Sequence, residues 1–264
     1  MAQSYSLFVA RESFVHRLNP LTKLTLTGLL LVSGLFLPGI WTNYLLFVGI
    51  VLPLSAAAGV TKQLVRSAWK IVLPFAISLF LIQGFLWPGG TPILYVGPLS
   101  LKSEGLQFAV VSTGRILMIV SSFLWFSLTT RPDHLMNSLS RIGFPSNLAY
   151  VIVATIQIAP RFQSRAATIL DAQRARGLET EGSLRTRARA LVPLVIPLVL
   201  SSLIDVEERA LAVEARAFNR QGTKTFLVEL PEAAWEPAAR WFMVVLMVSI
   251  LGLRVYLAIT RWRS

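Results

Sequence analysis

Long apolar runs separated by short polar segments dominate the chain. They cover residues 24–37, 41–60, 69–87, 106–128 and 237–259. A helix needs about 20 apolar residues to cross a bilayer. The short first run gains length from Thr22 and Lys23, because the polar end of a side chain can reach the membrane surface. The pattern therefore predicts about five transmembrane helices, four within residues 1–130 and one within residues 237–264.

The composition of the whole chain agrees with a membrane location. Of the 264 residues, 54% are hydrophobic and only 14% are charged, and the mean hydropathy is +0.63. A soluble domain carries about 25% charged residues, so this chain lacks the polar surface to dissolve as a monomer. We expect an all-α integral membrane protein. The chain has no cysteine, and His16 and His134 lie far apart, so no metal site is expected.

The basic residues predict how the helices are oriented. The turn after the first apolar run is uncharged, whereas three basic residues, Lys62, Arg66 and Lys70, lie between the second and third runs. Basic side chains collect on the cytoplasmic side, which places a retained N-terminus in the cytoplasm of a cell-membrane protein. The net charge of +12 has the same explanation, so no nucleic-acid partner is expected. A fifth span would place Arg261 and Arg263 outside the cell, against this preference for the cytoplasmic side. Either the larger number of basic residues upstream sets the orientation, or the count of spans is wrong by one.

Residues 131–236 form a charged segment that differs in kind from the apolar runs. Residues 161–224 contain 11 of the 25 basic residues, ten of them Arg, and 7 of the 13 acidic residues. We predict one helix over residues 161–177, which begins after Pro160 and ends at Gly177, and a second over residues 198–219. A short interfacial helix is expected over residues 133–142. On the second long helix, one stripe at helical spacing contains Asp205, Arg209, Arg216 and Arg220.

Two interpretations of the long helices are open: they lie on the membrane surface, or they bind a partner protein. A surface helix favours Lys and Arg on its polar face, yet acidic residues such as Asp205 and Glu208 stand among these arginines. Arginine suits bidentate contacts to carboxylates, so we favour a docking surface on amphipathic cytoplasmic helices. Arg115, inside the fourth apolar run, is either paired structurally or part of a pathway or partner contact.

Six short motifs along the chain are distinctive as a set. They are HRLNPLTKL at residues 16–24, TTRPD at 129–133, IGFP at 142–145, APRF at 159–162, ILDAQRARG at 169–177 and LAVEARAF at 211–218. Together they resemble the transmembrane T component of energy-coupling factor (ECF) transporters, the EcfT/CbiQ type. The likeness covers nearly the whole chain, and the paired Ala-Arg-Gly-type signatures are its most specific part.

The resemblance implies a transporter subunit without catalytic residues or a cofactor of its own. In that family, two cytosolic ATPases bind ATP and Mg²⁺, and a small membrane S component binds the vitamin or metal ion. The implied docking residues are Ala175, Arg176 and Gly177 for one ATPase and Ala215, Arg216 and Ala217 for the other. Nearby charged residues expected to support them are Arg174, Arg209, Glu214 and Arg220. Ala217 departs from the family, which usually has glycine there.

Two alternatives compete with this interpretation. The first is a membrane enzyme acting on phosphorylated lipids or isoprenoids, but Asp205, Glu207 and Glu208, its only acidic cluster, spread around a helix axis. The second is a stand-alone channel or carrier, which would place polar residues within several spans. Neither explains why an Ala-Arg signature occurs twice. Asp133 and His134, the only pair resembling a catalytic site near a span end, are better explained as the start of the interfacial helix.

Overall fold

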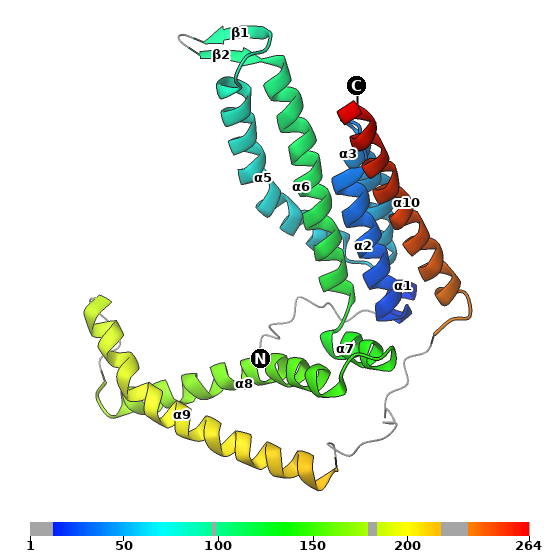
Figure 1. Ribbon diagram of the computed structural model, residues 1–264. Coiled ribbons are helices and arrows are strands. Elements are labelled where there is room, and N and C mark those ends of the chain that lie inside the picture. Colours follow the sequence, from blue (N-terminus) through cyan, green and yellow to red (C-terminus); the bar gives the residue numbers. More distant parts are fainter. Residues whose placement is uncertain (1–12, 97–98, 179–183, 218–231, 264) are drawn as a thin grey trace. The chain divides into compact units, whose positions relative to one another are not determined.

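The apolar runs form helices where the sequence predicts them. The structure, a computed structural model, describes residues 13–96, 99–178, 184–217 and 232–263 (Figure 1). The helices on the five apolar runs are α2 (Pro20–Phe36), α3 (Thr42–Leu46) continued by η1 (Phe47–Val51) and α4 (Leu52–Ala57), α5 (Thr61–Leu86), α6 (Ser103–Thr129) and α10 (Glu236–Arg263). Together with α1 (Phe14–Arg17) and α7 (Pro132–Arg141) they belong to one compact part of the chain, which we term the apolar unit.

Three of these helices are long and apolar enough to cross a membrane. They are residues Thr61–Leu86, Ser103–Thr129 and Glu236–Leu257, while Pro20–Phe36 and Thr42–Ala57 are shorter apolar helices. The protein is therefore a helical membrane protein. The count of five spans stays a prediction, because length and composition alone do not place the two shorter helices across a bilayer.

Two local features of the apolar unit were not foreseen from the sequence. Strands β1 (Pro92–Val96) and β2 (Leu99–Lys102) form an antiparallel hairpin at the end where α5 meets α6 (Figure 1). The second apolar run contains the wider π-helical turn η1 immediately before Pro53. Proline has no backbone N–H and crowds the preceding turn of an α-helix, so a wider turn is a physical means of keeping this helix continuous.

The core of the apolar unit lies where α5, α6 and α2 pack together. Its fully buried side chains include Leu30, Val51, Leu64, Met118 and Trp125. Helix α10 packs against α2 (Figure 1). The outer faces of α5 and α10 expose large apolar side chains such as Phe75 and Phe242. Broad exposed apolar surface marks a membrane or partner contact, as expected for helices in lipid.

A buried polar junction joins the start of α2, the end of α6 and the start of α10. Lys23 and Glu236 are each only 2% exposed. The Lys23 ammonium donates to the carbonyl oxygens of Thr129 at 2.9 Å and His16 at 3.2 Å. The Glu236 carboxylate accepts from the Asn19 N–H at 3.0 Å and the Thr22 hydroxyl at 2.7 Å. Because a buried charge needs such partners, these bonds hold the three helix ends together.

The remaining described residues form a pair of long helices, termed here the helix pair. Helix α8 spans Ser146–Ala175 and α9 spans Leu184–Ala215. The predicted helix starts at residues 161 and 198 were wrong, since α8 continues through Pro160 and α9 through Pro193 and Pro197. An internal proline removes one hydrogen bond and kinks a helix, but it does not end one when helix-forming sequence continues on both sides.

Replacing Glu236 by Gln tests the polar junction. The change removes the charge that strengthens three hydrogen bonds, including one from the Ala233 N–H, so we expect the free energy of unfolding to fall by about 2 kcal/mol. The measurement is chemical unfolding in mixed micelles. Glu232→Gln, which removes the same charge from the more exposed ion pair with Arg240, is the control and should cost less than about 1 kcal/mol. Equal losses would contradict a special role for Glu236.

Candidate functional site

Both helices of the pair end in a similar way: the last helical residue is an alanine, Ala175 or Ala215, and an arginine follows it directly. At the end of α8, the Gly177 N–H donates to the Arg174 carbonyl at 2.9 Å and the Leu178 N–H donates to the Gln173 carbonyl at 3.0 Å. This is the Schellman arrangement, in which a left-handed residue closes the helix, and Gly177 has φ +87°. At the end of α9, Ala217 has φ +51° and its N–H donates to the Glu214 carbonyl at 2.8 Å.

The closing turn presents each arginine at an exposed helix end. Arg176 and Arg216 occupy the same position, one residue before the left-handed residue. All six residues predicted to dock are exposed, namely Ala175, Arg176, Gly177, Ala215, Arg216 and Ala217. A guanidinium flanked by small side chains can enter a narrow groove and make two parallel hydrogen bonds to a carboxylate.

Ala217 is the point at which the two ends differ chemically. A left-handed conformation costs a residue with a Cβ about 1–2 kcal/mol, and glycine avoids this cost. A Cβ built on Gly177 would meet no atom within 4 Å. The preference for glycine at this turn therefore comes from the backbone angle rather than from lack of space, and α9 carries a strained end where α8 does not.

An ion pair joins the two long helices. Arg165 on α8 donates to both carboxylate oxygens of Asp205 on α9, at 2.6 and 3.2 Å, and to the Ser201 carbonyl at 3.2 Å. The hydrogen bond from Arg165 holds the pKa of Asp205 below its ordinary value, against the opposing effect of desolvation, and the charges of Arg209 and Arg161 act in the same direction as Arg165. The sequence placed Asp205 in a stripe along its own helix, and it missed this contact because Arg165 lies 40 residues away.

The other charged residues expected to support docking have varied surroundings. Arg174 pairs with Asp171 on its own helix at 3.5 Å. Glu214 contributes its backbone carbonyl to the end of α9, and Arg209 contributes its charge beside Asp205. Arg220 lies outside the described residues. These contacts show where the side chains lie, and their part in docking stays a prediction.

Two other positions singled out from the sequence belong to the apolar unit. Asp133 lies in the first turn of α7, which begins at Pro132, one residue before the predicted start of the interfacial helix, and it forms an ion pair with Arg131 at 2.7 Å. Arg115 has no ion pair within the described residues, and its buried Nε has no hydrogen-bond partner there. Across the described ranges, no group of three His, Cys, Asp or Glu side chains could hold a metal ion.

These features define a class of protein: a helical membrane protein that carries an exposed, arginine-ended helix pair. The family model described as CbiQ, cobalt transport protein, matches residues 11–226. The ECF transporter transmembrane protein EcfT of Limosilactobacillus fermentum is 31% identical over 260 residues, which cover 94% of this chain and 95% of the relative. The EcfT protein of Thermosediminibacter oceani is 27% identical over 246 residues, covering 88% and 90%.

The chain belongs to the CbiQ/EcfT family of transmembrane transporter components. This confirms the resemblance found in the motifs. Members of this family are non-catalytic membrane subunits of transporters, so the chain is not an enzyme. The alternative of a membrane enzyme acting on lipids or isoprenoids therefore has no support.

Replacing Asp205 by Asn tests the tie between α8 and α9. Losing the charge-assisted bonds from Arg165 should raise the hydrogen-exchange rate of amides around Ser201 by roughly twofold to fivefold, because the contact between the helices opens more often. Hydrogen exchange followed by mass spectrometry measures this. Asp171→Asn, which removes a carboxylate paired only within α8, should leave α9 unchanged. A matching effect from both variants would mean that the ion pair does not hold the helices together.

Exchanging glycine and alanine tests the strain at the two helix ends. Gly177→Ala should destabilise the last turn of α8, and Ala217→Gly should stabilise that of α9, each by about 1 kcal/mol. The measurement is the protection of the last-turn amides against hydrogen exchange. Gly252→Ala, within α10 and with no atom near its added Cβ, should instead stabilise its helix by about 0.5–1 kcal/mol. If Gly177→Ala also stabilised the last turn of its helix, the explanation from the left-handed backbone angle would be wrong.

Proposed function

We propose that this chain is the coupling subunit of an ATP-driven importer of the ECF type. In this proposal two ABC-type ATPases bind ATP and Mg²⁺, and each binds one end of the helix pair. A small membrane S component supplies the site for a vitamin or a transition-metal ion. The chain lies in the cell membrane with its N-terminus in the cytoplasm. The observation that carries the proposal is the repeated arginine-ended helix terminus.

The matching helix ends support binding to two similar partners. Arg176 and Arg216 each stand one residue before a left-handed turn and are exposed. Two copies of one groove, or two related grooves, would recognise the same backbone shape and the same charge. Because truncating one partner of a desolvated charge pair typically costs about 2–5 kcal/mol, these two contacts can account for much of the binding.

The length of the helices supports their use as levers. Helix α8 has 30 residues and α9 has 32, and a helix rises about 1.5 Å per residue. The Arg165–Asp205 pair ties them at a point away from their arginine ends. A displacement that an ATPase imposes on either end would therefore be transmitted along the helix, through the bends at its internal prolines, to the rest of the chain.

The exposed apolar surface supports a membrane partner. Large apolar side chains on the outer faces of α5 and α10 are exposed in the part of the chain that the structure describes. Some of this surface would face lipid and some would pack against the S component. In this proposal the S component also selects the transported substrate.

The double variant Arg176→Glu with Arg216→Glu tests the proposal. Reversed charges should repel the groove carboxylates, so a pull-down from mild detergent should lose both ATPases and substrate uptake should stop. The amount of protein in the membrane should not change, because both side chains are exposed. Each single variant should lose one of the two contacts.

Arg141→Glu serves as the control, since Arg141 is exposed at the end of α7 and outside the helix pair. It should keep the ATPases and the uptake. Normal uptake by the membrane-inserted double variant would overturn the proposed roles of Arg176 and Arg216.

A further inference from the structure

A cavity of about 290 Å³ lies within the apolar unit, where α1 leads into α2 and α6 leads into α7. Its charged and polar lining includes Arg17, Lys23, Thr130, Arg131 and His134. Among the described residues, no carboxylate lines it.

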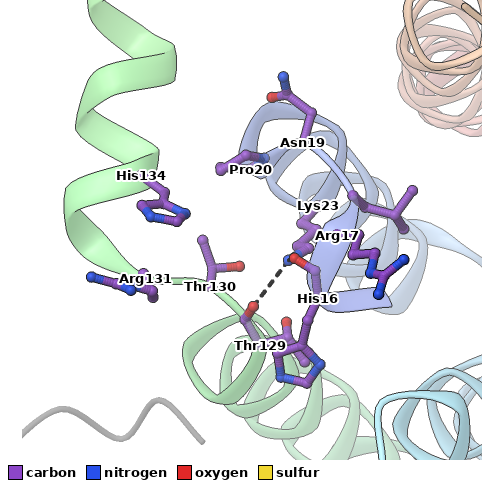
Figure 2. Close-up of a pocket in the computed structure, with 10 residues that line it drawn as sticks. His16, Arg17, Asn19, Pro20, Lys23, Thr129, Thr130, Arg131 and His134 are labelled. Carbon is purple, nitrogen blue, oxygen red and sulfur yellow. Dashed lines mark hydrogen bonds between the residues drawn. The ribbon is translucent and has the colours of Figure 1, made fainter. Parts of the chain in front are cut away.

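Two buried polar groups in the wall have unused hydrogen-bonding capacity. Lys23 uses two of its three ammonium hydrogens on the carbonyls of Thr129 and His16. Thr130 is 5% exposed, and its hydroxyl has no hydrogen-bond partner in the described part of the chain. Figure 2 shows Thr130 lying between His134 and Lys23. A buried hydroxyl without a partner costs free energy, and an acceptor inside the cavity would remove that cost.

The electrostatics of the wall favour an anion. The two nearby carboxylates are already engaged, Asp133 by Arg131 and Glu236 by the polar junction. Burial lowers the pKa of His134 below its ordinary value, and the positive charges of Arg131 and Lys23 lower that pKa further. The negative charge of Asp133 acts in the opposite direction. In its neutral form, which this shift favours, His134 can still donate one N–H.

We propose that this cavity binds the phosphate of an anionic phospholipid. Lys23 and the Thr130 hydroxyl would face the phosphate oxygens, with His134 as a further donor. Arg131 already donates from Nε and Nη2 to Asp133, so it would contribute only the guanidinium N–H groups that this pair leaves unused. Basic pockets between membrane helices are suited to lipid headgroups. This proposal does not depend on the docking of the helix pair to ATPases.

Three features favour a lipid over a free anion. The cavity lies at the ends of apolar helices, where α2 begins and α6 ends. Leu18 and Pro20 add carbon to its wall, which suits the glycerol end of a lipid. Near the starts of α1 and α10, the rings of Phe14 and Trp235 stack with their centroids 6.4 Å apart, and the two residues are 68% and 48% exposed. Exposed aromatic side chains of this kind are typical of a membrane surface.

Native mass spectrometry of the full chain in mild detergent tests the proposal. Phosphatidylglycerol and phosphatidylcholine with the same acyl chains are titrated separately, and the fraction of protein with one lipid bound is measured. The wild type should bind phosphatidylglycerol more tightly. Arg131→Gln and the uncharged, similarly shaped change Thr130→Val should each weaken it about fivefold. Arg141→Gln, the same change at the other end of α7, should bind as the wild type does.

Three results would overturn the proposal. The first is equal affinity of the wild type for the two lipids, and the second is equal binding of phosphatidylglycerol by Thr130→Val, Arg131→Gln and Arg141→Gln. The third is complete displacement of phosphatidylglycerol by millimolar inorganic phosphate, which would assign the cavity to a free anion. Thermal unfolding of each variant is measured alongside, and Thr130→Val keeps the test decisive if Arg131→Gln fails to fold.

Discussion

The burial of Lys23 and Glu236 is the constraint on which the apolar unit depends. Both side chains are 2% exposed, and they form no direct ion pair. Removing a charge from water costs several kcal/mol unless hydrogen bonds replace the lost hydration. Here the replacements are groups on other elements, so α2, α6 and α10 can satisfy these charges only when their ends meet. The junction thereby fixes where the apolar helices stop, and it forms one wall of the neighbouring cavity.

Much of the fold was predictable because its physical signal is local. Apolar runs and proline-glycine breaks placed α2, α5, α6 and α10 to within about ten residues, as hydrophobic patterns generally allow. The Ala-Arg-Gly signature placed the end of α8, where Gly177 marks the closing turn, whereas the second helix was predicted to reach residue 219 and α9 ends at Ala215. The predicted starts of α8 and α9 were wrong because a proline in a sequence is usually taken to mark the end or the start of a helix. In these two long helices the prolines lie inside and change only the local geometry.

What could not be predicted depends on contacts between distant residues. Glu236 reads as an ordinary first-turn acid of α10, yet its partner Thr22 lies 214 residues earlier. Asp205 had an apparent partner four residues away in Arg209, and only the three-dimensional arrangement selects Arg165 instead. Thr130 belongs to the TTRPD motif, but the sequence does not show that its hydroxyl is buried without a hydrogen-bond partner among the described residues.

The two ties in the chain differ in strength in a way that suits a coupling subunit. The junction around Lys23 and Glu236 is buried, so opening it would expose charges whose hydrogen bonds must break together. The side chains of Arg165 and Asp205 are each 40% exposed, and water can replace the hydrogen bonds between them at little cost. A force applied at the arginine ends would therefore change the contact between α8 and α9 first. The apolar helices, whose ends the buried junction holds together, would then respond as one body, so the displacement would still reach the rest of the chain.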